Sequence, residues 1–181
     1  QDPDIVMVGE IRDIETAKIA IQASLTGHLV LSTIHTNSAI GAIARLRDMG
    51  IESYLLSSSL RVVIAQRLVR RLCEDCKIPI KPSAKIQEEF QLDKNDTIYQ
   101  AIGCANCNDI GFKGRIALAE CITISDELKA LIHDEASEAQ LIESAFKDNL
   151  SLDLSSSQLL HDGLTSYEEL LRVQNYQDAN L

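Results

Sequence analysis

Aromatic residues and long hydrophobic runs are scarce in this 181-residue sequence. It contains no Trp, and aromatic residues make up 4% of the chain. Proteins that bind single-stranded nucleic acids stack bases on aromatic side chains, so this class of binding protein is disfavoured. No apolar run approaches the roughly 18 residues of a membrane-spanning helix, and no signal peptide opens the chain. We therefore expect a soluble, cytoplasmic protein without a membrane span.

Positive charge is also scarce, but only in the second half of the chain. Residues 1–80 hold nine Lys/Arg and nine Asp/Glu, whereas residues 81–181 hold eight and eighteen, which accounts for the net charge of −10. An acidic surface repels nucleic acids and anionic membranes, so neither is expected as a partner. The apolar content of 45% is sufficient for the core of one large domain or two small ones.

Two short apolar runs, residues 5–8 and 29–34, predict buried parallel strands. The Ala- and Ile-rich segment 14–25 predicts a crossover helix between them, so the three elements form a βαβ unit. The polar residues that end the two strands are Gly9, Glu10, Arg12 and Asp13 after the first, and Ser32, Thr33, His35, Thr36 and Asn37 at the second. Ligands of open α/β sheets bind outside the carboxyl ends of the strands, so these residues mark one edge of a site.

Mainly helical patterns follow this unit. Residues 38–49 predict a helix with a polar cap at its start, and apolar residues at helical spacing predict a longer helix over residues 53–72. Capping boxes at residues 137–140 and 166–169 predict the starts of two helices in an acidic C-terminal region. The predicted fold class is therefore α/β, followed by a helical half.

The run IVMVGEIRDIETAKIAIQASLTGHLVLSTIHTN, residues 5–37, resembles the Walker B and histidine-box region of the ATPases that drive type II secretion and type IV pilus assembly. The closing stretch GLTSYEELLRV, residues 163–173, is similar to the C-terminal signature of the same family. The resemblance thus extends over almost the whole chain. It implies that the chain returns to the ATPase core through a turn at residues 111–115 and a strand at residues 116–122. It implies the second half of a RecA-like P-loop ATPase core, and hydrolysis of ATP with Mg²⁺ in the full-length protein.

The phosphate-binding motif of such an ATPase does not occur here. A P-loop has the pattern G-x-x-x-x-G-K-[ST], in which backbone N–H groups cradle the phosphates and the Lys reaches the β and γ oxygens. The sequence contains no Gly-Lys-Ser or Gly-Lys-Thr. We therefore expect a C-terminal fragment that begins between the P-loop and the Walker B strand, and that hydrolyses ATP feebly or not at all by itself.

Glu10 and His35 are the candidate catalytic residues. Gly9 stands where many P-loop enzymes have an Asp directed at Mg²⁺, so Glu10 is the only carboxylate directly after the first strand. The resemblance implies that Glu10 is the catalytic carboxylate, which activates or orients the attacking water. His35 lies past the carboxyl end of the second strand and is expected to sense or polarise the γ-phosphate. His28, at the amino end of that strand, is predicted to have a capping or packing role instead.

Three neighbouring residues are assigned to the nucleotide site. Thr33 and Thr36 could donate their hydroxyls to phosphate or water, although Thr is also common in strands as a strand former. Arg12 is expected to pair with Asp13 and so to orient Glu10, but exposed ion pairs contribute little to stability.

Four of the five cysteines form two C-x2-C pairs, separated by 27 residues. Four thiolates suit tetrahedral zinc, and they leave no open position for substrate, so a structural zinc site is predicted at Cys73, Cys76, Cys104 and Cys107. A loop or a short helix, such as residues 83–90, would fill the spacer. The alternatives are two disulfides, which a reducing cytosol disfavours, or ordinary buried thiols. Cys121 has no partner nearby and is predicted to be a core residue of a strand.

We expect residues 1–72 to form the second half of the ATPase core, residues 73–111 a zinc-binding insert, and residues 112–181 a returning strand and a helical C-terminal subdomain. The resemblance implies a homo-hexameric cytoplasmic ATPase that is peripheral to the inner membrane through a platform protein of the secretion or pilus machine. In that family, extension motors carry a four-cysteine insert that retraction motors generally lack. A retraction motor and a zinc-stabilised interaction domain without catalysis stay open as alternatives, whereas the net charge opposes a zinc-ribbon module that binds nucleic acid.

Overall fold

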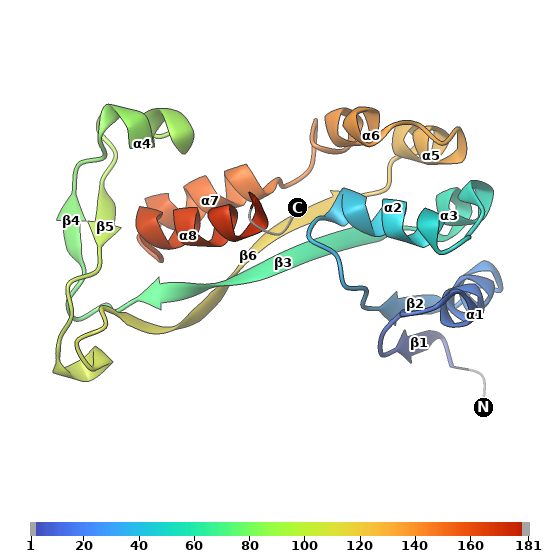
Figure 1. Ribbon diagram of the computed structural model, residues 1–181, viewed down its shortest axis with the longest axis horizontal. Coiled ribbons are helices and arrows are strands. Elements are labelled where there is room, and N and C mark those ends of the chain that lie inside the picture. Colours follow the sequence, from blue (N-terminus) through green and yellow to red (C-terminus); the bar gives the residue numbers. More distant parts are fainter. Residues whose placement is uncertain (1–2, 179–181) are drawn as a thin grey trace. The chain divides into compact units, whose positions relative to one another are not determined.

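The computed structural model describes residues 3–178, and the side chains of residues 3–173. The chain divides into two compact units: residues 1–65 with 121–149 form unit 1, and residues 66–120 with 150–181 form unit 2. Two long strands, β3 (Val62–Leu72) and β6 (Phe112–Thr123), contribute residues to both units. They pair in a two-stranded sheet, and their arrows run in opposite directions in Figure 1.

Unit 1 begins with the predicted βαβ arrangement. Strand β1 (Ile5–Val8) and strand β2 (Leu29–Ser32) pair in parallel, with Ile5 opposite Leu29 and Val8 opposite Ser32. Helix α1 (Ile14–Leu25) connects them and has the predicted boundaries. The β2 strand is two residues shorter than predicted. Its early end places Thr33, His35 and Thr36 in the connection to the next helix.

The expected burial of these two strands is wrong. Ile5, Met7, Leu29 and Leu31 are all at least half exposed, with values between 51% and 77%. The two strands form a sheet by themselves, so one row of apolar side chains is left in contact with solvent. The apolar runs therefore predicted the two strands correctly, but not the exposure of their side chains to solvent.

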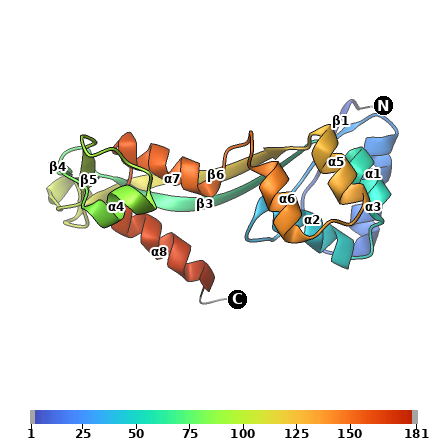
Figure 2. The ribbon, with the colours of Figure 1, turned by 90° about the horizontal axis from the view of Figure 1, so that it is seen from above.

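Helices complete unit 1. They are α2 (Ala39–Asp48), α3 (Ser53–Ser59), α5 (Asp126–His133) and α6 (Glu138–Ala145). Within this unit α5 packs against α3 and α6 against α2, as Figure 2 shows. The core includes Ile40, Ile43, Leu56, Ile122, Leu128, Ile132 and Leu141, each at most 1% exposed. Ser38 caps α2 by accepting a hydrogen bond from the N–H of Gly41 at 3.0 Å, and this confirms the predicted helix start.

The predicted helix over residues 53–72 is wrong in its second part. Helix α3 ends at Ser59, and Val62–Leu72 is strand β3, in which side chains 62–68 alternate between more and less exposed. The run VVIAQRLV matches helical spacing and a period of two equally well, so periodicity could not separate them. Its β-branched residues favour a strand, and pairing with β6 decides the conformation.

Unit 2 contains both cysteine pairs. Its further elements are β4 (Ile78–Ile80), α4 (Ala84–Glu89), β5 (Ile98–Gln100), the short 3-10 helix η1 (Ala105–Cys107), α7 (Leu152–His161) and α8 (Tyr167–Asp178). Strands β4 and β5 pair antiparallel, with Ile78 opposite Gln100. The core contains Val69, Phe90, Ile98, Leu118, Leu160 and Leu170. The helix predicted in the cysteine spacer is confirmed as α4.

Two further predictions are corrected in part. The returning strand β6 starts at Phe112 rather than at residue 116, so most of the predicted turn is strand. The capping box of residues 137–140 is complete at the start of α6. At residues 166–169 only half of a capping box forms. The N–H of Glu169 donates to Ser166 Oγ at 3.4 Å, but the Glu169 carboxylate turns to Arg70 and Arg172 instead. Cys121 lies in strand β6 as predicted and is half-buried.

Candidate catalytic site and metal centre

The two segments that follow β1 and β2 are held together by hydrogen bonds. The N–H of Ile11 donates to the Thr33 carbonyl at 2.8 Å, and the Thr33 hydroxyl donates to the Gly9 carbonyl at 2.8 Å. These bonds extend the contact between the chains past the end of the parallel ladder. They bring Glu10 and His35 together, 25 residues apart in sequence.

Glu10 is the centre of this strand-end site. Arg12 Nε donates to Glu10 Oε2 at 2.6 Å, and His35 Nε2 lies 2.6 Å from Oε1. The imidazole is close enough for an ion pair when protonated, but it is not in hydrogen-bonding geometry. Oε1 is buried and has no hydrogen-bond partner among the residues that the structure describes. Buried carboxylate oxygens without a hydrogen bond are costly, and each such group in a folded protein requires an explanation, for example a catalytic role or a bound water or ion.

The environment of Glu10 is asymmetric. The Glu10 side chain is 21% exposed, whereas the side chains of Arg12 and His35 are 76% and 89% exposed. The carboxylate is thus sheltered while both of its neighbours face solvent. One oxygen is held in place by the guanidinium, and the other faces an accessible imidazole.

The predicted pairing of Arg12 with Asp13 is wrong. Arg12 pairs with Glu10 itself, while Asp13 Oδ1 accepts from the N–H of Thr16 at 2.8 Å and caps α1. This bond lowers the pKa of the Asp13 carboxyl. The free N–H groups at the start of a helix attract a short acidic side chain, and they compete successfully here with a neighbouring cation.

The two threonines lie beside the site, and both of their hydroxyls donate to backbone carbonyls. Thr33 donates to Gly9, and Thr36 donates to the Ser38 carbonyl at 3.1 Å. Their hydroxyl oxygens can still accept hydrogen bonds. His28 Nδ1 lies 3.0 Å from the Ala23 carbonyl and 3.1 Å from Thr26 Oγ1, at the end of α1. The capping role predicted for His28 is confirmed.

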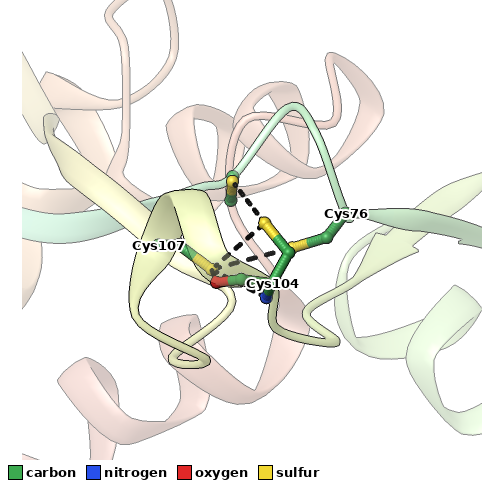
Figure 3. Close-up of side chains that lie close together, drawn as sticks. Cys76, Cys104 and Cys107 are labelled. Carbon is green, nitrogen blue, oxygen red and sulfur yellow. Dashed lines mark hydrogen bonds between the residues drawn. The ribbon is translucent and has the colours of Figure 1, made fainter.

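The four cysteines of the two C-x2-C pairs converge in unit 2. Their sulfur atoms all lie within 4.8 Å of one another, and no disulfide joins them. Sγ–Sγ distances are 3.9 Å for Cys73–Cys104 and 3.8 Å for both Cys76–Cys107 and Cys104–Cys107. Figure 3 shows the side chains of Cys76, Cys104 and Cys107 pointing toward one another. The cluster could hold a metal ion.

Both cysteine pairs form the same kind of tight turn. The Cys73 carbonyl accepts from the N–H groups of Cys76 and Lys77, and the Cys104 carbonyl accepts from Cys107 and Asp109. Two sulfurs are thereby presented by each turn. Asn106 Nδ2 donates to Asp75 Oδ2 at 3.1 Å and links the two turns to each other.

Two glycines allow the second turn to close. Gly103 has φ +121°, and a Cβ placed there would lie 2.6 Å from the Asp109 carbonyl oxygen. Gly111 has φ +79°, and its Cβ would lie 2.7 Å from Cβ of Ala101. Other residues are strained at such φ values, and they would also collide with the backbone, so both glycines are required for this geometry.

Two backbone N–H groups donate hydrogen bonds to one of the four sulfurs, that of Cys107. The N–H groups of Cys104 and Gly111 each donate to Cys107 Sγ at 3.2 Å. Burial raises the pKa of this thiol, but these two bonds and the Cys104 and Cys76 side chains together outweigh burial and lower the pKa to about 7. Burial and the neighbouring cysteines raise the pKa of Cys76 to about 12. The backbone N–H groups thus favour the thiolate form of Cys107, which is the form that binds metals.

One polar network was not recognised from sequence. The Glu169 side chain is fully buried and accepts hydrogen bonds from Arg70 Nε at 2.9 Å and from Arg172 Nη2 at 2.7 Å. The backbone N–H of Arg70 donates to it as well, and the Arg70 guanidinium lies 4.1 Å from the centre of the Phe112 ring. Arg70 and Glu169 are 99 residues apart, and no local pattern in the sequence indicates their pairing.

A parallel strand pair that ends in a sheltered carboxylate and a histidine is the arrangement expected of an α/β ATPase. The chain matches the model of the type II/IV secretion system protein family over residues 1–172, and it belongs to that family. Among the described residues, no helix is long and apolar enough to cross a bilayer.

Relatives of known name agree with this membership. The type II secretion system ATPase E of Vibrio cholerae is 50% identical over 175 residues, which are 96% of this chain and 35% of that protein. The type IV pilus assembly ATPase PilB of Myxococcus xanthus is 46% identical over 180 residues, which are 94% of this chain and 31% of PilB. The chain thus spans about a third of these relatives and matches their C-terminal part.

Solved structures show the same fold. The pilus retraction motor PilT with bound ADP superposes with a TM-score of 0.66 at 26% identity, over 96% of this chain and 40% of PilT. The ATPase DotB of Legionella pneumophila has a TM-score of 0.64 at 18% identity, over 96% of this chain and 39% of DotB. The α/β fold is that of these ATPases.

Proposed function

We propose that the chain is the C-terminal part of a hexameric, cytoplasmic ATPase that powers assembly of type II secretion pseudopili or type IV pili. The observation that carries the proposal is the Glu10 carboxylate, because one oxygen is held by Arg12 and the other is buried without a hydrogen-bond partner beside His35. Such a carboxylate can orient a water and accept its proton. The relatives named as ATPases support this assignment.

In this proposal each residue has a separate role. Glu10 accepts a proton from the attacking water at Oε1, and Arg12 keeps the carboxylate from rotating by occupying Oε2. His35 Nε2 is exposed and next to Oε1, so it can reach a phosphate oxygen that enters the site. Arg12, Thr33 and Thr36 line the nucleotide side. Mg²⁺ neutralises phosphate charge in enzymes of this type, and the P-loop that helps to hold it lies outside this sequence.

The strands β1 and β2 belong, in this proposal, to a RecA-like core that is completed by other parts of the full-length protein. Parallel sheets are generally covered on both faces. The exposed apolar row of Ile5, Met7, Leu29 and Leu31 supports the proposal that another part of the full-length protein covers this face of the sheet. Residues 1–72, 73–111 and 112–181 keep their proposed roles as core half, metal-binding insert and C-terminal region.

The four cysteines are proposed to bind one structural Zn²⁺. Four sulfurs placed tetrahedrally at about 2.3 Å from zinc are separated by about 3.8 Å. Three of the six Sγ–Sγ distances, at 3.8 and 3.9 Å, match this value, and all six lie within 4.8 Å. Four thiolates close the coordination sphere, so zinc would stabilise the two turns and take no part in the reaction.

An assembly motor is favoured over a retraction motor. PilB, named as an assembly ATPase, is 46% identical to this chain, whereas PilT, named as a retraction motor, is 26% identical. The cysteine cluster also fits an extension motor, in line with the family resemblance described above. The hexamer and the inner-membrane platform protein belong to the same proposal.

The test compares two proteins. The complete ATPase, with its P-loop, should hydrolyse ATP, and the chain of 181 residues should show no saturable Mg-ATP binding at micromolar concentrations in calorimetric titration. A complete protein that binds zinc but lacks ATPase activity would instead support a zinc-stabilised interaction domain. A low-micromolar dissociation constant for the isolated chain would reveal a second nucleotide site and contradict the proposed dependence on the P-loop.

A further inference from the structure

The first cysteine turn is joined to the turn between α7 and α8 by a series of contacts within unit 2. The Thr165 hydroxyl donates to the Arg70 carbonyl at 2.8 Å, and the N–H of Leu72 donates to the Leu164 carbonyl at 2.9 Å. Further along both segments, Lys77 Nζ donates to the Gly163 carbonyl at 3.0 Å. Residues 70–77 therefore run beside residues 163–165, with a contact near each end.

Lys77 has an unusual environment for a lysine. Its side chain is only 16% exposed, and its ammonium contacts Glu74 Oε2 at 2.6 Å as well as Gly163. It also lies 4.9 Å from the centre of the Tyr99 ring. Lysines are rarely buried unless they are paired. This lysine loses most of its hydration and receives three partners in return.

The position of Lys77 depends on the cysteine turn. It follows Cys76 directly, and its backbone N–H donates to the Cys73 carbonyl at 3.0 Å. The backbone that carries Lys77 is therefore the backbone that presents two of the four sulfurs. Any change in this turn moves the base of the lysine side chain.

The receiving side is equally constrained. Gly163 has φ +62°, and a Cβ there would lie 2.5 Å from the Tyr99 ring. The Gly163 carbonyl that accepts from Lys77 thus lies in a closely packed turn. Ser166, which is buried and precedes α8, follows three residues later. A displacement of Lys77 would leave this carbonyl without its charged donor.

We propose that Lys77 is a positioning residue that couples metal binding at the four cysteines to the docking of the α7–α8 turn. The inference rests on the proposed Cys₄ metal centre. Lys77 acts through the backbone of the first cysteine turn, because its N–H donates to the Cys73 carbonyl while its side chain is anchored at Gly163 and Glu74. Outer-shell residues that hold metal ligands in position commonly change metal affinity by 10- to 100-fold when mutated.

The test measures hydrogen exchange of the complete protein with zinc bound and after zinc removal by a chelator under reducing conditions. We expect zinc removal to lower the protection of residues 163–170 at least tenfold and to leave α1 and α2 of unit 1 unchanged. In Lys77→Met, this zinc-dependent protection should disappear. Because coupling between two equilibria is reciprocal, zinc affinity should fall by a similar factor, measured by competition with a chromophoric chelator.

Lys81→Met is the matched control. Lys81 lies in the same part of unit 2, and its Nζ also donates to backbone carbonyls, those of Asn95 and Asp96, but it contacts neither cysteine turn. We expect this variant to keep wild-type zinc affinity and wild-type exchange at residues 163–170. Lys77→Arg retains the positive charge and should restore part of the coupling.

Each outcome decides the inference. Equal protection of residues 163–170 with and without zinc in the wild-type protein would overturn it, and this result needs no variant. Undiminished zinc-dependent protection in Lys77→Met would overturn it as well. Elemental analysis separates the two proposals, because a protein without zinc refutes the metal centre itself, whereas a zinc-containing protein without coupling refutes only the role of Lys77.

Discussion

The strand-end site around Glu10 in unit 1 and the polar network around Glu169 in unit 2 differ in how their carboxylates are paired. Glu10 keeps one buried oxygen without a hydrogen-bond partner, and its neighbour His35 is 89% exposed. Glu169 is just as central in unit 2, but Arg70 and Arg172 donate to both of its oxygens. The cysteines likewise gather their sulfurs within 4.8 Å of one another.

This difference indicates what each region requires. A buried polar group without a partner is costly, and it persists where a ligand completes it. The Glu10 oxygen fits the proposed reaction site, which must leave room for groups that come from elsewhere. The Glu169 carboxylate is completed by two arginines of this chain, as in a structural site.

Replacing a cysteine should have the largest effect. Cys73→Ser removes one of four proposed ligands, and because metal binding contributes directly to folding, we expect unit 2 to lose its zinc and to become less stable. Elemental analysis should fall from about one zinc per chain to near zero, since a closed site needs all four ligands. Cys121→Ser is the control and should keep its zinc. Full zinc occupancy in Cys73→Ser would remove that residue from the site.

Glu10→Gln should abolish turnover in the complete ATPase without preventing ATP binding. The amide has the size of the carboxylate but cannot accept the proton of the attacking water, and loss of a general base commonly costs about 10²–10⁴-fold. Single-turnover hydrolysis measures this loss. Glu15→Gln, an exposed acidic position on α1, should retain wild-type rates.

His35→Ala sharpens the assignment of Glu10. We expect it to slow hydrolysis less than Glu10→Gln, because in the proposed mechanism His35 would contact a phosphate that the P-loop and Mg²⁺ also hold. Near-native turnover in Glu10→Gln, together with complete loss in His35→Ala, would show that the catalytic carboxylate is assigned wrongly.

Glu169→Gln should lower the stability of unit 2 by about 3 kcal/mol, since breaking a buried ion pair leaves a charge without its partner. Burial raises the pKa of Glu169, but hydrogen bonds from Arg172 and Arg70 outweigh burial and lower the pKa to about 2. Because the pKa is lower in the folded state, the carboxylate stabilises the fold above about pH 4.5 and this contribution is lost as the pH falls toward 2.

Denaturant unfolding between pH 5 and pH 2 measures this effect. The wild-type protein should lose stability across that range more steeply than Glu169→Gln, which has no carboxyl to protonate there. Glu168→Gln, one residue earlier and exposed, should follow the wild-type curve. Parallel curves for the wild-type protein and Glu169→Gln would mean that the buried pair does not contribute to acid sensitivity.

Ser38→Ala should have the smallest effect. Its hydroxyl accepts from the N–H of Gly41 at the start of α2, and loss of such a cap costs about 1 kcal/mol. Ser58→Ala is a suitable control, because the exposed Ser58 hydroxyl only donates back to the Tyr54 carbonyl within its own helix. Thermal unfolding should rank Ser38→Ala below both Ser58→Ala and the wild-type protein.

Features that depend on a short stretch of sequence were predicted well. The boundaries of α1, the cap at the start of α2 and the capping box of α6 all follow from side chains and backbone groups within about four residues of one another. The two C-x2-C pairs belong to the same class, because each turn presents its two sulfurs locally. The sequence by itself determined these elements, since their stabilising contacts form within one turn or one strand.

Only the tertiary structure decided the remaining features. Val62–Leu72 became a strand because β6, which begins 40 residues after it ends, supplies its hydrogen-bond partners. Glu169 does not complete its capping box, because its carboxylate accepts hydrogen bonds from Arg70, 99 residues away. In each case a local preference competes with a distant partner of similar strength, and only folding brings that partner within reach.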